Sequence, residues 1–309
     1  MLEISNGMSK VVVTGGAGFI GSNLTERLIN DGHEVVVIDN LVTGKRENLH
    51  PRAKFLEADI ADYDGIAPLF QGVEAVFHCA ALARIQPSIQ NPLPANQTNI
   101  TGTLNVLWAA YKSGAKKVIY SGSSSAYGEQ DPKNLPLRET LQPRPGSPYA
   151  LQKYVGELYC QLFSKLYSLS TVVLRYFNVY GPRQITEGTY AAVMGIFLKQ
   201  RQEGQPMTVV GDGEQRRDFT HISDVVEANV LAWQKDVPPG EVINIGAGHN
   251  YSVNEVAKFI GGPTVNVPPR PGEYRITLAD NRKAGVLLGW KPRMAMEQAI
   301  ADLKKAHGL

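Results

Sequence analysis

Short apolar runs rich in β-branched residues alternate with longer stretches of helical spacing through the first half of the chain. This alternation restricts the fold more than any other feature, because it is the pattern of βαβ units, in which helices connect parallel strands. The runs are continuously apolar, which indicates strands that are covered on both faces. We therefore expect an α/β fold with a doubly wound parallel sheet, with strands at residues 10–13, 33–38, 54–57, 75–78, 117–121 and 171–175 and helices at residues 20–30, 95–112 and 148–167.

The second half of the chain is less regular. After Gly181-Pro182-Arg183, clusters of glycine and proline predict short strands and loops. Residues 222–233 have helical spacing and residues 241–245 form another apolar run, so we expect the chain to return to the sheet. We predict that residues 8–180, with a return at about 218–248, form the sheet domain, and that residues 181–217 and 249–309 form a smaller C-terminal substrate-binding region.

The composition excludes several classes of protein. Hydrophobic residues make up 43% of the chain and charged residues 19%, which fits a globular protein and not a disordered one. The 31 basic and 29 acidic side chains leave a net charge of +2, without the basic excess of nucleic-acid-binding proteins. No apolar run approaches the roughly eighteen residues that span a bilayer, and the start of the chain does not resemble a secretory signal. We expect a cytoplasmic protein that binds neither nucleic acid nor membrane.

The two cysteines, Cys79 and Cys160, are 81 positions apart. This spacing fits neither a disulfide framework nor a zinc site. We expect two buried thiols and no metal.

A glycine-rich segment, residues 14–21, connects the first expected strand to an amphipathic helix. Glycines let the backbone approach a pyrophosphate closely, and the helix that follows presents free amides to the anion. An ordinary glycine-rich turn is the alternative, but Asp39 ends the next strand, eighteen residues after Gly21, where an acid accepts hydrogen bonds from the adenosine ribose. We therefore predict a dinucleotide site, with NAD favoured over NADP because an acid repels a 2′-phosphate. The loop contributes Gly15, Gly18, Phe19, Ile20 and Gly21.

A second wall of this site is expected at the end of the fourth strand. Ala80 and Ala81 are small enough for the dinucleotide to lie flat against them. His78 lies within an apolar strand, so we interpret it as a hydrogen-bonded core residue and not a catalytic one. Asp59 ends the third strand, beside the expected adenine position, and Asn99 is either a cofactor contact or only a helix cap.

Tyr149 and Lys153 lie four residues apart, on one face of the helix that Ser147 and Pro148 begin. Lowering the pKa of a tyrosine from about 10 to about 7 requires roughly 4 kcal/mol of preference for the phenolate. A cation about 5 Å away contributes roughly 3 kcal/mol of this. We predict that Tyr149 removes and returns a hydroxyl proton, that Lys153 holds the phenolate and the nicotinamide ribose, and that Ser123 hydrogen-bonds the reacting oxygen. The alternative is a surface pair beside a serine-rich loop.

These motifs, with the serine run before Tyr127-Gly128 and the segment from Arg175 to Arg183, resemble the extended short-chain dehydrogenase/reductases of the NAD-dependent epimerase/dehydratase family. Within the family the chain resembles the 4-epimerases of UDP-glucose and UDP-N-acetylglucosamine, from Ser9 to Gly308. The resemblance implies a Rossmann domain for NAD, a smaller region for the nucleotide sugar, and a homodimer.

The resemblance also assigns residues. It implies NAD contacts at the glycine loop and at Asp39, Asn40, Asp59, Ile60, Ala80, Ala81, Asn99, Tyr149, Lys153, Tyr176 and Val179. It implies substrate contacts at Ser123, Ser125, Asn178, Arg217, Arg270, Glu273 and Thr277. The adjacent Arg216 leaves the first arginine uncertain by one position. In the related epimerases a bulky residue at the sugar wall excludes N-acetyl groups, so a threonine at position 277 is expected to admit them.

Three positions distinguish this chain from relatives in the family. The dehydratases and decarboxylases carry acidic residues where this chain has Ser124 and Ser125, which disfavours 4,6-dehydration. Arg84 faces the sugar by resemblance and could pair with a uronate carboxylate, although we favour an arginine that faces solvent. We therefore expect a UDP-hexose 4-epimerase, with a UDP-glucuronate 4-epimerase or another dehydratase or reductase of the family as alternatives. A non-catalytic, redox-sensing NAD-binding protein would not need Ser123, Tyr149 and Lys153 together.

Overall fold

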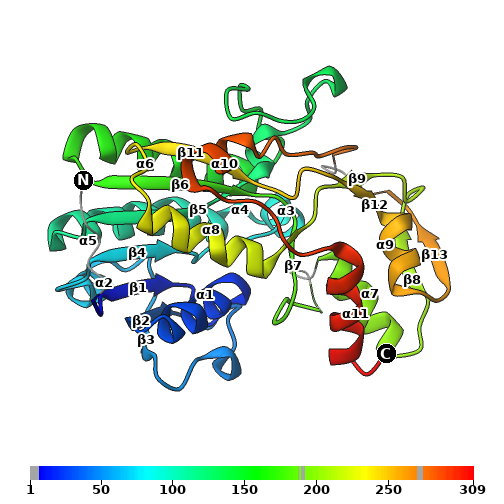
Figure 1. Cartoon of the computed structure of the whole chain (residues 1–309), viewed down its shortest axis with the longest axis horizontal. Helices are drawn as coiled ribbons and strands as arrows, with labels where there is room; N and C mark the ends of the chain where they lie inside the picture. Colours follow the sequence, from blue (N-terminus) through cyan, green and yellow to red (C-terminus); the bar gives the residue numbers. More distant parts are fainter. Residues whose placement is uncertain (1–6, 187, 189–191, 270–273) are drawn as a thin grey trace.

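The computed structural model describes residues 7–186, 188, 192–269 and 274–309. Seven strands form one parallel sheet in the order β11-β6-β5-β4-β1-β2-β3 (Figure 1). The order reverses between β1 and β4, and such a switch point is where doubly wound sheets bind ligands. The α/β fold expected from the sequence is confirmed. The strands are β1 (Lys10–Thr14), β2 (Glu34–Asp39), β3 (Lys54–Glu57), β4 (Ala75–His78), β5 (Lys117–Ser123), β6 (Ser170–Tyr176) and β11 (Glu241–Ile245).

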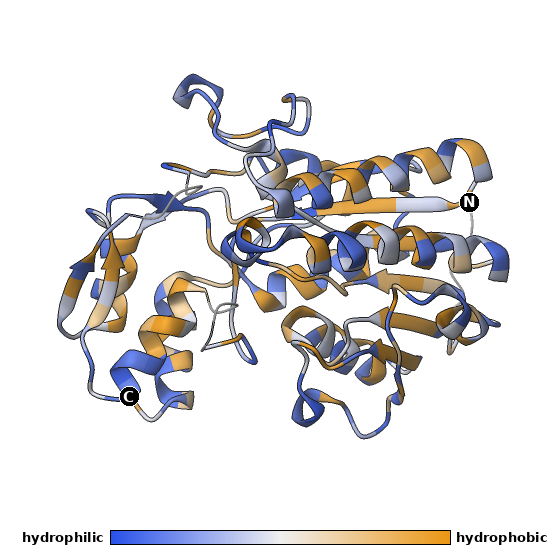
Figure 2. Ribbon diagram, turned by 180° about the vertical axis from the view of Figure 1, so that it is seen from behind, coloured by the Kyte–Doolittle hydropathy of each residue, from blue (hydrophilic) through white to orange (hydrophobic). Residues whose placement is uncertain are grey.

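Helices cover both faces of this sheet, because successive side chains of each strand point to opposite faces. Val11 and Val13 pack with α1 (Phe19–Asn30), α8 (Ile222–Gln234) and α10 (Arg282–Leu288). Val12 packs on the other side with α2 (Tyr63–Ile66), η2 (Ala67–Phe70), α5 (Thr103–Ser113) and α6 (Pro148–Tyr167). The apolar colour of the central strands in Figure 2 reflects this burial on both faces.

A buried ion pair fixes α6 to β6. Arg175 on β6 donates two hydrogen bonds to Glu157 on α6, at 2.9 and 2.5 Å, and the two side chains are 2% and 4% exposed. The same guanidinium lies 4.6 Å from the centre of the Tyr127 ring. The pair therefore positions the helix that carries Tyr149 and Lys153.

The single helix expected at residues 95–112 is divided in three. The segments are α4 (Pro92–Asn96), a π-helical turn η3 (Gln97–Gly102) and α5. In this region Thr103 donates its hydroxyl to the carbonyl of Asn99 at 2.7 Å, and Gly102 lies so close to Ile60 that a Cβ would be 2.6 Å from its Cδ1. These contacts depend on the tertiary fold, which apolar spacing does not report.

The smaller C-terminal region lies beyond the carboxyl ends of the strands, on the right of Figure 1. Its core joins α7 (Val193–Gln202), β8 (Met207–Val210), α9 (Val253–Ile260), β13 (Thr264–Val267) and α11 (Met296–Ala306). Two short strand pairs connect this region to the sheet: β7 (Val179–Tyr180) with β10 (Thr220–His221), and β9 (Arg216–Arg217) with β12 (Tyr251–Ser252). The remaining short helices are η1 (Arg46–Asn48), α3 (Ile85–Gln90), η4 (Ser124–Tyr127) and η5 (Pro132–Asn134).

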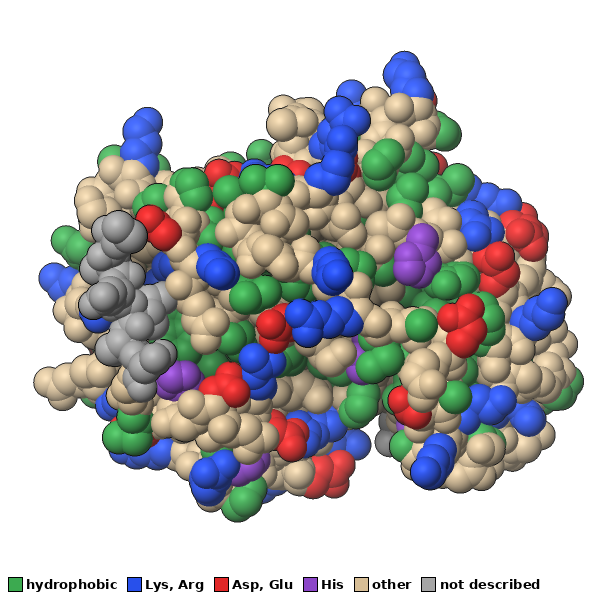
Figure 3. Space-filling view, viewed as in Figure 1, with side chains coloured by type: hydrophobic (Ala, Val, Ile, Leu, Met, Phe, Trp, Pro, Cys, Tyr) green, Lys and Arg blue, Asp and Glu red, His purple; other side chains and the backbone are tan. Residues whose placement is uncertain are grey.

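Figure 3 shows basic and acidic side chains interspersed over one face of the molecule. Within the described ranges, no helix combines the length and apolarity needed to cross a membrane. Clusters of three or more metal-ligating side chains are likewise absent from the part of the chain that the structure describes.

Candidate active site

A cavity of about 770 Å³ lies between the carboxyl edge of the sheet and the smaller C-terminal region. Its walls include the loops that follow β1, β2, β3, β4, β5 and β6, which meet at one edge because the strands are parallel. Its volume lies within the usual range for pockets that enclose small molecules. The site is therefore built where a doubly wound sheet places its ligands.

The glycine loop forms one end of the cavity. Gly15 has φ +70°, and a Cβ there would lie 2.7 Å from the backbone of Ala80. A Cβ at Gly21 would collide with the carbonyl of Gly15, so both positions need glycine. Gly18 precedes α1, whose first amides are free to bind an anion. The loop thus has the space and the donors that a dinucleotide pyrophosphate requires.

Asp39 ends β2 in this part of the cavity. Its Oδ2 accepts the amide of Ala17 at 3.0 Å, and its Oδ1 accepts the amide of Leu41 at 2.8 Å. Burial raises the pKa of Asp39, and these two hydrogen bonds lower it in part. Each oxygen keeps a lone pair for a ribose hydroxyl. Beyond the predicted cofactor contact, Asp39 therefore also holds the glycine loop in place, a role that sequence did not indicate.

Residues after β3 and β4 complete the wall predicted for NAD. Asp59, Ile60, Ala80 and Ala81 all line the cavity, and Asn40 donates to Asp59 at 3.1 Å. Phe19, Ile20, Tyr176 and Val179 line it as well. The residues present fit the cofactor that the fold implies, because a tight backbone cradle, a helix amino end and a ribose acid occur in the expected order.

Two polar residues near this wall are buried and satisfied. His78 hydrogen-bonds Thr14 at 2.7 Å and Thr103 at 3.0 Å, and burial lowers its pKa to about 3. It is therefore a neutral core histidine, as expected. Asn99 hydrogen-bonds both backbone groups of Leu82 and the side chain of Gln152. Its side chain does not line the cavity and instead supports the loop that does.

The cysteines differ from one another. Cys160 is buried as expected, whereas Cys79 is only partly buried and lines the cavity. The prediction of two buried thiols is therefore wrong for Cys79, because the chain leaves the sheet at this residue. Burial raises the pKa of Cys79 to about 11, which keeps the thiol protonated.

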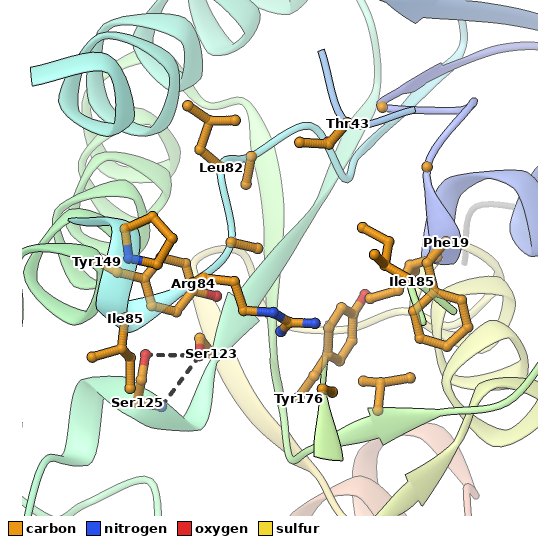
Figure 4. A pocket seen from close by; sticks show the side chains of 18 of the residues that line it. Phe19, Thr43, Leu82, Arg84, Ile85, Ser123, Ser125, Tyr149, Tyr176 and Ile185 are labelled. Carbon is orange, nitrogen blue, oxygen red and sulfur yellow. Dashed lines mark hydrogen bonds between the residues drawn. The ribbon is translucent and has the colours of Figure 1, made fainter. Parts of the chain in front are cut away.

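Tyr149 occupies the first turn of α6 and lines the cavity with Ser123 and Ser125 (Figure 4). The helix begins as predicted, with Ser147 accepting the amide of Ala150 at 3.2 Å. The hydroxyls of Ser123 and Ser125 are 2.8 Å apart, and Ser123 also accepts the amide of Ser125. Burial raises the pKa of Tyr149, while hydrogen bonding to Ser123 and the charge of Arg84 lower it.

Lys153 lies beneath the cavity wall and does not line it. Its ammonium is 4.3 Å from the centre of the Tyr120 ring, and burial lowers its pKa to about 8. Among the charged groups, Arg84 lowers the pKa of Tyr149. The role predicted for Lys153, to hold the phenolate and the nicotinamide ribose, stays a prediction. Tyr149 and Lys153 both belong to α6, as predicted, and the Lys153 ammonium lies over the ring face of Tyr120.

Arg84 extends into the cavity, with its guanidinium between Tyr149 and Tyr176 in Figure 4. Burial lowers the pKa of Arg84, and the nearby Tyr149 raises it. The favoured expectation of an arginine facing solvent is therefore wrong. Arg84 is the residue that precedes the short helix α3, and its backbone is extended.

Three residues predicted to contact the substrate come together from distant segments. Asn178, Arg217 and Thr277 all line the cavity. Arg216 points elsewhere, because it hydrogen-bonds Asn250 at 2.9 Å and forms an ion pair with Glu255. Arg217 is thus the arginine of this pair that faces the site. The predicted contacts Arg270 and Glu273 lie outside the described residues.

Sequence reasoning missed several cavity residues on the smaller region. They share no motif, and they lie on short strands and loops that apolar spacing does not resolve. They include Tyr180, Phe197, Thr208, Gln215, Phe219 and Tyr274. Among these, Tyr180 had a signal in the sequence, because it lies within the segment from Arg175 to Arg183 that carries the family resemblance.

Comparison with known proteins identifies the family. Residues 11–246 match the model of the NAD dependent epimerase/dehydratase family. The chain belongs to this family. A putative UDP-glucose 4-epimerase of Methanocaldococcus jannaschii is 41% identical over 301 residues, which cover 94% of this chain and 95% of that protein. Family and cofactor class agree with the sequence analysis, so the protein is an NAD-dependent enzyme.

Two solved structures are similar over almost their whole length. The UDP-glucose 4-epimerase of Thermotoga maritima, solved with UDP-glucose, has a TM-score of 0.92 and 41% identity, covering 97% of each chain. The UDP-N-acetylglucosamine 4-epimerase of Methanobrevibacter ruminantium, solved with UDP-N-acetylmuramic acid, has a TM-score of 0.91 and 38% identity, covering 96% of this chain and 97% of that one.

Proposed function

We propose that the protein is a UDP-hexose 4-epimerase that retains NAD, and that it interconverts UDP-N-acetylglucosamine with UDP-N-acetylgalactosamine and UDP-glucose with UDP-galactose. The observation that carries the proposal is the position of Tyr149 and Ser123 in one cavity with the glycine loop. When bound, NAD accepts a hydride from C4 of the sugar and returns it to the other face of the resulting 4-keto sugar. Tyr149 takes the proton of the 4-hydroxyl and gives it back. Because the hydride is returned as well, the reaction needs no external oxidant.

The serine pair supports epimerisation over dehydration. Ser123 hydrogen-bonds the reacting oxygen, and Ser125 orients the Ser123 hydroxyl at 2.8 Å. Elimination of water requires an acid or base at neutral pH, and a serine hydroxyl is a poor substitute for a carboxylate. Positions 124 and 125 are both serine. Epimerisation needs only the base, its hydrogen-bonding partner and the hydride carrier.

The size of the sugar wall supports an N-acetylated substrate. Thr277 is 6% exposed and lines the cavity beside Asn178. A threonine occupies much less volume than an aromatic side chain, which leaves room for an acetamido group at C2.

Arg84 supports a second candidate, UDP-glucuronate 4-epimerase. Its guanidinium lies in the cavity near Tyr149, where it would form a paired hydrogen bond with a carboxylate at C6 of the sugar. A neutral hexose gives the guanidinium no such partner. The two candidates therefore differ in the substrate they turn over and in the effect of Arg84→Met.

The test is product analysis with UDP-glucose, UDP-N-acetylglucosamine and UDP-glucuronate, each without added NAD. We expect the 4-epimers of the first two, and at least as much turnover of the N-acetylated sugar as of UDP-glucose. Tyr149→Phe should keep NAD and lose at least about a hundredfold in turnover. Turnover of UDP-glucuronate alone, abolished by Arg84→Met, would favour the second candidate. If Tyr149→Phe kept a tenth of the activity, the assignment of the base would be wrong.

We also propose that the enzyme is a homodimer located in the cytoplasm. Leu151, Leu158, Leu162 and Leu166 lie at helical spacing on α6, and each is 44–60% exposed. Tyr111 of α5 and Tyr167 continue this apolar surface. A second copy of the same face is a suitable partner, because a twofold interface is self-complementary. Sedimentation should show a dimer that Leu158→Asp and Leu162→Asp dissociate; an unchanged mass would exclude this surface.

A further inference from the structure

Asp218 lies in the sequence between Arg217 and Phe219, which both line the cavity, but Asp218 itself does not line it. It is completely buried. Its Oδ1 accepts the amide of Ala247 at 2.7 Å, and its Oδ2 accepts the amides of Gly248 and Ala279 at 3.0 Å each. One carboxylate therefore joins the loop after β11 to the segment that contains Thr277.

The backbone of Asp218 makes contacts on the other side. Its amide donates to the hydroxyl of Thr277 at 3.3 Å, and its carbonyl accepts the side-chain amide of Asn178 at 2.9 Å. The same Asn178 amide lies 3.5 Å from the Thr277 hydroxyl. Asp218 thus contacts Asn178 and Thr277 directly and is covalently joined to Arg217, so it connects the three described substrate-side residues.

A carboxylate suits this junction better than any other side chain. Burying it is costly, since it loses its hydration, and three amide donors offset that cost in part. Burial raises the pKa of Asp218 to about 6, and the amides of Ala279, Ala247 and Gly248 oppose the rise. An asparagine has the same shape, but its NH₂ group would face one of these N–H donors and leave it unpaired.

We propose that Asp218 is the positioning residue of the substrate side of the cavity: it sets the relative places of Asn178, Arg217 and Thr277 and so determines affinity for the UDP-sugar without touching it. This inference rests on the proposed function for the identity of the ligand. The NAD side of the cavity depends on other residues, since the glycine loop is held by Asp39. Loss of Asp218 should therefore affect substrate binding and leave cofactor binding unchanged.

The nearby Asp280 supplies a matched control. It is 6% exposed and belongs to the same segment as Thr277, but its carboxylate binds Arg282 and Arg138 and not the cavity segments. Asp280→Asn makes the same substitution, of a carboxylate oxygen by an NH₂ group, and removes the same charge from the same region. The comparison of Asp218→Asn with Asp280→Asn separates positioning of the site from a general effect on the smaller region.

The experiment measures NAD content, calorimetric binding of UDP, and KM and kcat for the UDP-sugar that the wild type turns over. Asp218→Asn should weaken UDP binding and raise KM by about tenfold, with kcat within about threefold and full NAD content, because one buried donor is left unpaired. Asp280→Asn should resemble the wild type. UDP binding does not depend on turnover, so failure of the proposed reaction would leave this readout intact. Unchanged UDP affinity in Asp218→Asn, or an equal loss in both variants, overturns the proposal.

A milder pair of variants covers the case in which Asp218→Asn does not fold. Thr277→Val removes the hydroxyl that accepts the Asp218 amide and keeps the side-chain volume, whereas Thr277→Ser keeps the hydroxyl. We expect Thr277→Val to raise KM several-fold above the wild-type value, whereas Thr277→Ser should keep KM close to that value. NAD content should be unchanged in both variants. Equal KM values for the two variants would show that the hydrogen bond from the Asp218 amide to the Thr277 hydroxyl does not position the substrate side of the cavity.

Discussion

Arg175→Met should destabilise the protein by about 3–5 kcal/mol, because it leaves the buried carboxylate of Glu157 without its charged partner. Glu157 is 4% exposed, so water cannot replace the two hydrogen bonds that Arg175 donates. The variant also loses the guanidinium 4.6 Å from the Tyr127 ring, a contact worth up to about 2 kcal/mol in a desolvated site. Since these terms overlap, we take the range for the broken pair as the expected total.

The measurement is denaturant unfolding, monitored by intrinsic fluorescence. Lys116→Met is a suitable comparison, because its pair with Glu74 is exposed on the lysine side and should contribute less than about 1 kcal/mol. The double variant Arg175→Met/Glu157→Leu should recover much of the loss, since it replaces both charges with apolar groups. A loss below about 1 kcal/mol for Arg175→Met, or no recovery in the double variant, would refute the reasoning.

Three further predictions concern the site. Thr277→Tyr should abolish turnover of UDP-N-acetylglucosamine and spare UDP-glucose, as steady-state rates would show; retained N-acetyl activity would mean that Thr277 is not the gate. Denatured protein should release NAD, and NADP as the main nucleotide would contradict the role assigned to Asp39. Lys153→Met should raise the free energy of unfolding at pH 7 by up to about 3 kcal/mol, because the pKa of the buried lysine falls from 10.5 to about 8. That gain should shrink as the pH rises from about 8 to about 10.5, since the wild-type ammonium then loses its proton; a gain independent of pH would argue against a buried charge.

The apolar pattern predicted the strands of the sheet closely, because strands that are covered on both faces appear in the sequence as short, continuously apolar runs. The strands at residues 54–57, 75–78 and 241–245 and the helix at 148–167 have the predicted bounds. The π-helical turn at 97–102 was not predicted, because apolar spacing does not report tertiary contacts such as the close approach of Ile60 to Gly102.

The candidate site was predictable where backbone conformation determines it, as in the glycine loop. The site was less predictable where a long side chain can reach several different partners. Lys153 lies against Tyr120, and Arg84 enters the cavity, although local sequence allows either side chain to point elsewhere. The choice between Arg216 and Arg217 needed the pairing of β9 with β12, which orients the two side chains.

The place of β11 in the sheet has a consequence for biosynthesis. β6 pairs with β5 on one side and with β11 on the other, yet β11 follows β6 in the chain only after α7 and α8. A ribosome therefore completes the first six strands of the sheet well before the seventh is available. During that interval the outer edge of β6 presents unpaired amides and carbonyls beside Val172 and Leu174, which is a template for association with other chains. Nascent chains stalled before residue 241 should accordingly depend on chaperones, and fragments that end there should aggregate although they hold every residue of the glycine loop.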